Sequence, residues 1–371
     1  MFWFIHDNEP TQLPGPGKEV KSASQQVLDL DQELEDLSYL SREDQLAYLD
    51  LLIDSSLESI REAESGSHVP VILKELKMIL SSLPQETASQ VIQNALAKQL
   101  EEDLSTGLDF KVGSDGSLSE ASSVRVALLD WLGQMDRFTA GRLAEEILKQ
   151  PTEPDEWAIS LRNYAWANPA PASYSFLRDR VLKLIENPEW RGEPTEGYLA
   201  AFDVLVYTQS KEAVPVLLQF IDKSAEADSP TGRIALFTLD QMVVQEPEAL
   251  IRILDNLPEL SASSGEMIAQ MVARADLSRP ALRGAVSRYL LDPARTDMEL
   301  SAFAAIFPNR AFKESNNLLS ETMIPKGAER ILQDRAAYSQ IEAWIDDTRF
   351  GERLSYLLTI KKRLESFIDL D

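Results

Sequence analysis

Apolar side chains recur at helical spacing along much of this chain, most regularly over residues 42–64. Successive apolar positions there are three, four, four and three residues apart, which places them on one face of an α-helix. Ser41 stands where an N-cap residue belongs, Asp44 follows three residues later, and Gly66 ends the pattern. The apolar positions are Leu46, Leu49, Ile53, Leu57 and Ile60. The pattern predicts a capped amphipathic helix.

Breaks in this spacing divide the chain into regions. The predicted regions are an apolar start with a Pro/Gly linker (1–23), an acidic helical unit (24–104), a loop (105–120), a repeat array (121–310) and C-terminal capping helices (311–371). The acidic unit includes further helices over 69–82 and 86–104, and two longer helices are expected within 326–371. The glycines and serines of the loop leave room for a short hairpin. No β-strand pattern is clear anywhere in the chain, so we expect an all-α fold.

A turn followed by an apolar helix recurs at a nearly constant interval. The clearest copies start at Ser210 and Glu246, and weaker copies start at Asp136 and Ser173. In chain order these starts are 37, 37 and 36 residues apart. A period of this length is typical of one helical hairpin per repeat, with neighbouring hairpins stacked over a shared core. We therefore expect an α-solenoid with atypical helices closing both ends.

One of these copies also resembles a known repeat family. The run AVPVLL at 213–218 follows an apolar stretch and is similar to the second helix of a HEAT or armadillo repeat. Proline costs little in a first helical turn, because its missing N–H has no acceptor there. Asp136, Ser210 and Glu246 stand where this family usually carries Asp, and each could act as an N-cap. The resemblance, over 121–310, implies a right-handed superhelix of stacked helical hairpins that binds other macromolecules.

Composition limits the chemistry that the chain can carry. Its net charge is −25, and it has no cysteine and two histidines. An acidic surface repels phosphate, so we expect no nucleic-acid partner. Thiol chemistry and Cys-ligated metals are excluded. His6 lies in the apolar leader and His68 in a turn, so neither belongs to a catalytic or metal-binding pattern. We therefore expect no catalytic residue, no metal ligand and no cofactor.

Two features are candidate surfaces for a protein partner. Twelve carboxylates over 29–64 face only two arginines, a local balance of −10 that suits either a basic partner or a solvated helix face. Trp157 and Tyr164 lie seven residues apart in a predicted helix, where they either floor a peptide groove or pack between hairpins. The candidate partner-binding residues are Glu33, Glu35, Asp36, Glu43, Asp50, Asp54, Trp157 and Tyr164.

These observations favour a non-catalytic scaffold or adaptor that binds a protein partner, with its acidic surface selecting a basic one. Two alternatives stay open. A carboxylate-dependent hydrolase or lyase would need a deep pocket with acids such as Asp203 or Asp240 at raised pKa. A membrane-tethered envelope protein would need an anchor, of which the apolar start Met1–Ile5 would be the remnant. Without such an anchor we expect a cytoplasmic protein, and the sequence favours no particular oligomeric state.

Overall fold

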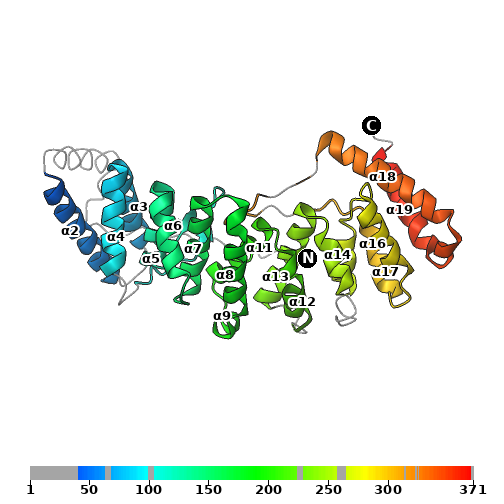
Figure 1. Cartoon of the computed structure of the whole chain (residues 1–371), viewed down its shortest axis with the longest axis horizontal. Helices are drawn as coiled ribbons and strands as arrows, with labels where there is room; N and C mark the ends of the chain where they lie inside the picture. Colours follow the sequence, from blue (N-terminus) through cyan, green and yellow to red (C-terminus); the bar gives the residue numbers. More distant parts are fainter. Residues whose placement is uncertain are drawn as a thin grey trace, which may run out of the picture.

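Helices make up most of the chain and follow one another in chain order along one long row (Figure 1). The computed structural model describes residues 41–62, 68–98, 104–223, 229–256, 265–312, 315–321, 324 and 326–368. The first half of the row contains α2 (Arg42–Arg61), α3 (Val69–Ser82), α4 (Gln85–Lys98), α5 (Val124–Met135), α6 (Arg137–Ile147), α7 (Pro154–Ala167), the 3-10 turn η1 (Pro171–Ser173), α8 (Tyr174–Glu186) and α9 (Pro188–Gly192).

The second half continues in the same way. It contains α10 (Glu196–Ala200), α11 (Asp203–Tyr207), the 3-10 turn η2 (Lys211–Ala213), α12 (Val214–Lys223), α13 (Pro230–Gln245), α14 (Ala249–Asp255), α15 (Gly265–Val272), α16 (Pro280–Leu291), α17 (Asp297–Ile306), α18 (Gly327–Ile345), the 3-10 turn η5 (Thr348–Arg353) and α19 (Leu354–Ile368). The predicted helical character of the chain is therefore confirmed over its described residues.

The N-terminal helices form where the apolar spacing predicts them. α2 begins after Ser41, whose hydroxyl accepts a hydrogen bond from the Asp44 N–H, and its apolar stripe is buried where the helix contacts α3 and α4. α3 coincides with the predicted helix over 69–82. α4 is described from Gln85 to Lys98, and residues 99–103 of the helix expected over 86–104 lie outside the described residues. The periodicity and the N-cap predicted for α2 are confirmed, whereas Gly66, which was expected to end the helix, lies outside the described residues.

A short β-hairpin occupies the predicted loop over 105–120, so strands are present after all. β1 (Lys111–Val112) pairs antiparallel with β2 (Leu118–Glu120), and their register shifts between the two β1 residues. Gly116 in the connecting turn has a φ of +78°, in the left-handed region that glycine enters without strain. The hairpin contacts α5 and α10, and it thereby joins the N-terminal helices to the middle of the row.

The row has two sides, because helices contact a helix two or three places further along the chain. On one side α5 contacts α7, α7 contacts α10, α10 contacts α13, α13 contacts α15, and α15 contacts α17. On the other side α12 contacts α14, and α14 contacts α16. One cluster of buried apolar side chains extends from Leu49 to Leu364. The cluster of buried apolar side chains therefore continues past the hairpin.

Each repeat start predicted from the sequence comes shortly before a helix. Asp136 caps α6 by accepting a hydrogen bond from the Thr139 N–H at 3.0 Å. Ser173 ends η1 immediately before α8, Ser210 precedes η2 and α12, and Glu246 lies three residues before α14. The side chains of Ser210 and Glu246 do not cap the helices that follow them. The capping prediction is therefore right for Asp136 and wrong for these two residues. The reason is that an additional turn separates each of them from the helix.

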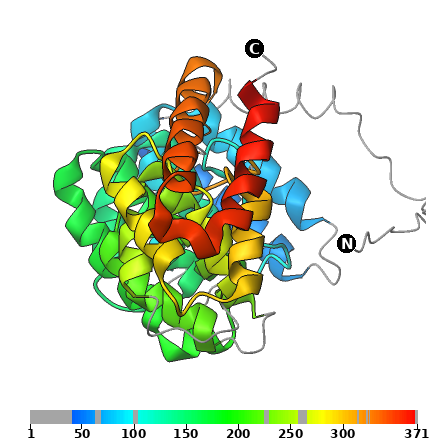
Figure 2. The ribbon, with the colours of Figure 1, turned by 90° about the vertical axis from the view of Figure 1, so that its right-hand side faces the viewer.

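Two long helices, α18 and α19, end the row, as predicted for the C-terminal residues. Figure 2 looks along the row from this end and shows α18 and α19 in front of the other helices. The connection from α17 to α18 covers residues 307–326, twenty residues. This connection forms the candidate site.

Candidate functional site

The structure separates the acidic residues that the sequence singled out. Glu33, Glu35 and Asp36 lie outside the described residues. Glu43 is exposed in the first turn of α2, where its charge favours the helix dipole. Asp54 forms an ion pair with Lys98 of α4 at 2.9 Å, and the half-buried Asp50 accepts a long hydrogen bond from Asn94 of the same helix. Two of these acids thus help to hold α2 against α4.

The two predicted aromatic candidates lie in different surroundings. Trp157 is only 2% exposed; its indole ring meets that of Trp190 edge to face at 5.6 Å, and its N–H donates to a backbone carbonyl. Tyr164 is half-buried and packs on the ring of Phe176 at 4.4 Å between centroids. Trp157 belongs to the core between α7 and its neighbours, so it presents no surface to a partner.

Residues 315–321 of the long connection lie across the middle of the row, and we call this segment the strap. It covers a groove formed by α10, α11 and α13, which we call the strap groove. The side chains that line the groove include Leu199, Asp203, Val206, Ile234, Phe237 and Gln241. The strap joins these helices to the hairpin, because its contacts reach β1 on one side and α13 on the other.

Asp203 makes the central polar contact between groove and strap. Its carboxylate accepts the N–H groups of Leu319 and Ser320 at 2.7 and 2.9 Å, and it also accepts the Ser320 hydroxyl. Burial raises the pKa of Asp203 above its ordinary value of 3.8, although these three hydrogen bonds act in the opposite direction. The site is therefore a partly desolvated carboxylate aimed at the backbone of a segment that bends at Leu318 and Leu319.

Leu318 anchors the strap against the hairpin. Its side chain is 1% exposed, and its carbonyl oxygen lies so close to Gly116 that a Cβ added there would be 2.6 Å away. The Asn316 amide donates to the Val112 carbonyl of β1 at 3.1 Å. At the other end, the Gln245 amide of α13 donates to the Glu321 carbonyl at 2.8 Å. Main-chain atoms of the strap take part in most of these contacts.

A small cavity of about 120 Å³ remains beside the strap. Gln241 of α13 lines this cavity and is 2% exposed, yet neither its amide nitrogen nor its amide oxygen has a hydrogen-bond partner among the described residues. A buried amide without partners costs free energy, and nearly all buried polar side chains in proteins have at least one. The strap therefore covers the groove without satisfying all of its polar groups.

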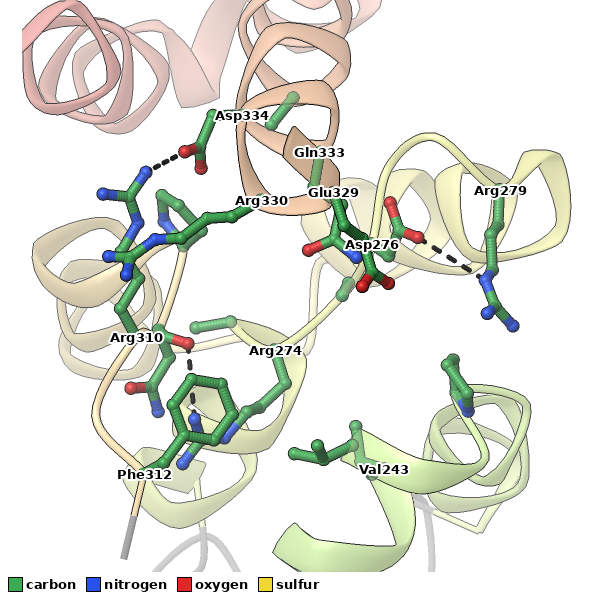
Figure 3. Close-up of a pocket in the computed structure, with 17 residues that line it drawn as sticks. Val243, Arg274, Asp276, Arg279, Arg310, Phe312, Glu329, Arg330, Gln333 and Asp334 are labelled. Carbon is green, nitrogen blue, oxygen red and sulfur yellow. Dashed lines mark hydrogen bonds and ion pairs between the residues drawn. The ribbon is translucent and has the colours of Figure 1, made fainter. Parts of the chain in front are cut away.

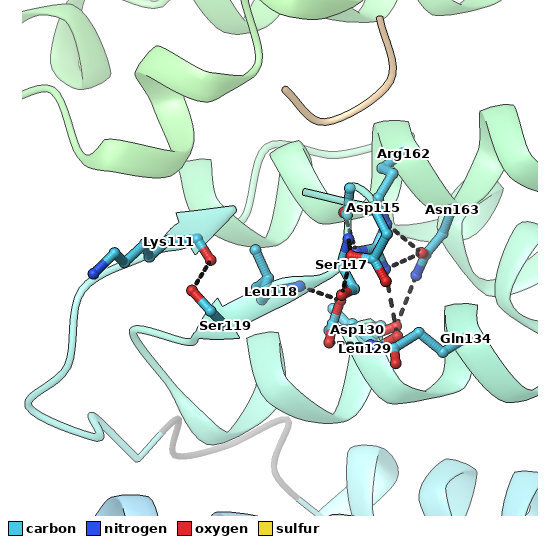
Figure 4. A network of polar contacts seen from close by, with 11 residues as sticks. Lys111, Asp115, Ser117, Leu118, Ser119, Leu129, Asp130, Gln134, Arg162 and Asn163 are labelled. Carbon is cyan, nitrogen blue, oxygen red and sulfur yellow. Dashed lines mark hydrogen bonds and ion pairs between the residues drawn. The ribbon is translucent and has the colours of Figure 1, made fainter. Parts of the chain in front are cut away.

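A buried polar network fixes the hairpin that the strap touches (Figure 4). The Arg162 guanidinium of α7 donates to Asp130 of α5 at 2.5 Å and to the Gly116 carbonyl at 2.8 Å. Asp130 also accepts the Leu118 N–H of β2 at 3.0 Å. Asn163, which accepts from Arg162, donates to the Leu129 carbonyl at 2.8 Å. The turn that receives Leu318 is thus held from two helices by charge-assisted hydrogen bonds.

The strap was missed by the sequence reasoning, and Asp203 was singled out only as a hydrolase candidate. The structure places Asp203 at the strap. It places Asp240 in a bidentate ion pair, in which the Arg274 guanidinium donates to both carboxylate oxygens at 2.7 and 2.8 Å. Only Asp203 of these two lines the groove. A usable signal did exist, because the twenty residues between α17 and α18 exceed the usual length of a loop without its own secondary structure.

A second pocket lies where α18 meets α13 and the chain that follows α15 (Figure 3). Three of its four arginines form ion pairs: Arg274 with Asp240, Arg279 with Asp276 at 3.5 Å, and Arg310 with Asp334 of α18. Arg274 also donates to the backbone carbonyls of Asn309 and Ala311. We interpret this pocket as the seam that holds α18 to the row.

Across the described parts of the chain, no cluster of three or more acidic or histidine side chains could hold a metal ion. The same residues include no helix that is both long and apolar enough to cross a lipid bilayer. The apolar start, on which the envelope hypothesis depends, lies outside them. No protein-family model matches the chain, and no curated protein or solved structure is significantly similar to it.

Proposed function

We propose that this chain is a non-catalytic α-solenoid of HEAT-like helical hairpins, wound as a right-handed superhelix, that binds a protein partner through the strap groove. The near-constant spacing of the four repeat starts supports the solenoid, and so do the contacts between alternate helices on each side of the row. The N-terminal helices and the pair α18–α19 would be its atypical ends. Such arrays commonly use an extended face to bind other proteins.

The observation that carries the binding proposal is the way the groove holds peptide backbone. Asp203 accepts two consecutive main-chain N–H groups, and Gln245 donates to a main-chain carbonyl two residues after the first of them. Main-chain contacts of this kind provide affinity for any segment that can bend in the same way as the strap, while adjacent pockets select side chains. The groove is therefore suited to a short stretch of polypeptide rather than to a small molecule.

The charge of the chain favours a basic partner. At a net charge of −25, the molecule attracts positively charged proteins over a distance of about one Debye length and speeds their encounter with it. Exposed acids such as Glu43 of α2 add to this field without being needed for packing. Selection by charge would thus act on the encounter, and the groove would act on the bound complex.

Pull-down with the full chain tests this function. We expect the immobilised protein to retain a reproducible partner from its native organism, and Phe237→Asp in the strap groove to abolish that retention. Phe138→Asp is the matched control, because Phe138 is 74% exposed on α6 and does not line the groove. Equal retention by both variants, or no reproducible partner at all, would count against the proposal. Far-UV circular dichroism establishes that both variants are folded.

A further inference from the structure

We propose that the strap is a built-in competitor that occupies the groove in place of the partner, and that the partner's segment carries an apolar residue two positions before Ser or Thr. This inference rests on the function proposed above. In the strap these two residues are Leu318 and Ser320. In a partner segment, the positions equivalent to Leu319 and Ser320 must each donate a main-chain N–H to Asp203. Proline is therefore excluded at both positions.

The path of the connection indicates that its purpose is more than joining two helices. Asn309 and Arg310, at its beginning, line the same pocket as Glu329 and Arg330, near the start of α18. Its two ends are therefore neighbours. Between them the chain reaches the hairpin, where Asn316 contacts Val112, before it returns. A direct link would need only a few residues, so the excursion serves the groove that it covers.

The contacts within the groove are of a kind that another segment can replace. Asp203 recognises two main-chain N–H groups and one hydroxyl, which a peptide with Ser or Thr at the second position supplies when its backbone bends as the strap does. The anchor is one apolar side chain, Leu318, beside the glycine turn. Since none of these contacts depends on a feature unique to the strap, a partner segment can make them equally well.

Gln241 gives an external segment an advantage over the strap. Its amide lines the cavity beside Ser315–Leu318 and has no partner among the described residues. A partner segment with an amide side chain or a main-chain amide at this place would satisfy both Gln241 atoms. The strap would then be the weaker ligand per contact, and its tether would compensate by raising its effective concentration to the millimolar range.

A labelled synthetic peptide with the strap sequence SNNLLSE tests the inference. The full chain and its variant Leu318→Asp, whose strap cannot bury a charged anchor, are titrated with this peptide, and binding is followed by fluorescence anisotropy. We expect the variant to bind at least tenfold more tightly than the wild type, because the tethered strap no longer competes. Ser320→Gly, which removes only the hydroxyl contact with Asp203, is a second, milder way to loosen the strap should Leu318→Asp fail to fold.

Three controls give the test its specificity. Peptides with proline at the position of Leu319, or aspartate at that of Leu318, are expected to bind the loosened chain at least tenfold more weakly. When Asp203→Asn is combined with Leu318→Asp, the double variant is expected to bind the original peptide about tenfold more weakly than Leu318→Asp alone. If the wild type and both loosened variants bind the peptide equally, or if the proline peptide binds as well as the original, the competitor role is wrong.

The two proposals fail separately. A partner retained in a manner that depends on Phe237, together with no gain of peptide binding on loosening the strap, leaves the scaffold function intact and removes only the competitor role. Peptide binding that follows these rules, together with no partner in the pull-down, supports the groove as a peptide site and counts against the scaffold function.

Discussion

At the scale of single residues, the most demanding feature is a pair of buried charges. The side chains of Arg162 and Asp130 are 0% and 1% exposed, so each charge is tolerated only because the other faces it. Asp203 is held differently, since its partners are N–H groups and a hydroxyl rather than a cation. The first arrangement stabilises the hairpin permanently, whereas the second depends on the strap staying in place.

Replacing Arg162 with methionine is expected to cost about 3–5 kcal/mol of stability. The substitution leaves Asp130 buried without its cation and leaves the Gly116 carbonyl without its donor. A large fall in the urea midpoint would be the sign of this loss. Arg42→Met is the control, because Arg42 and its partner Glu86 are both largely exposed, and its midpoint should stay unchanged. Equal midpoints for the two variants would contradict the assignment.

The raised pKa of Asp203 predicts a pH dependence of known sign. The folded chain holds a proton on this carboxyl at a higher pH than the unfolded chain, in which the pKa of the carboxyl is 3.8. The stability that this proton contributes is complete below pH 3.8 and is lost as the pH rises through the raised pKa. Asp203→Asn cannot titrate. The free energy of unfolding of the wild type should therefore fall relative to that of Asp203→Asn over this window, and parallel curves would refute the burial of the carboxyl.

At the scale of elements, the hairpin and the strap depend on each other. Arg162 and Asp130 fix the turn of the hairpin, and that turn offers Gly116 as a surface without a Cβ, on which the Leu318 carbonyl lies. Neither element has regular structure long enough to be stable alone. Their positions are therefore set by tertiary contacts with α5, α7 and α11.

Gly116→Ala is expected to lift the strap from the hairpin. A Cβ there would be 2.6 Å from the Leu318 carbonyl oxygen, and the residue also has a φ of +78°. Hydrogen exchange at the Leu319 and Ser320 amides should become at least tenfold faster, since these amides are protected by Asp203. Gly107→Ala shares the backbone strain, with a φ of +67°, but would meet no atom within 4 Å. Faster exchange in both variants would mean that strain alone explains the effect.

At the scale of the whole molecule, the strap adds a contact that a simple row of helices lacks. In a stacked array each unit contacts its neighbours, so the ends can unfold independently. The strap contacts β1, which lies more than two hundred positions before it in the chain, and α11, which lies more than a hundred positions before it. We therefore expect it to couple the two halves of the row during unfolding.

Loosening the strap is expected to uncouple these halves. Four of the six tryptophans lie between residues 131 and 190, so their fluorescence reports mainly the first half, while far-UV circular dichroism reports all helices. The two signals should give one common thermal transition in the wild type and separate transitions in Leu318→Asp. Coincident transitions in both proteins would show that the strap contributes no coupling.

Much of the helical architecture could be predicted from the sequence. The stripe of α2, its cap at Ser41 and the bounds of α3 follow from residues three or four positions apart, because a helix forms its hydrogen bonds over that distance. The repeat period likewise marked the positions where α6, α8, α12 and α14 begin. Capping at Ser210 failed as a prediction, because an intervening turn is not visible in residue spacing.

The candidate site could not be predicted in this way. Asp203 was named from the sequence only as one acid of a possible hydrolase or lyase pocket, but its partners lie 116 and 117 positions further along the chain. Leu318 and Ser320 have no periodic pattern around them to mark them. The helices and their recurring interval follow from the local spacing of residues, so both can be read from the chain alone. The position of the strap depends on burial and hydrogen bonding between segments far apart in the chain, so it became known only from the three-dimensional structure.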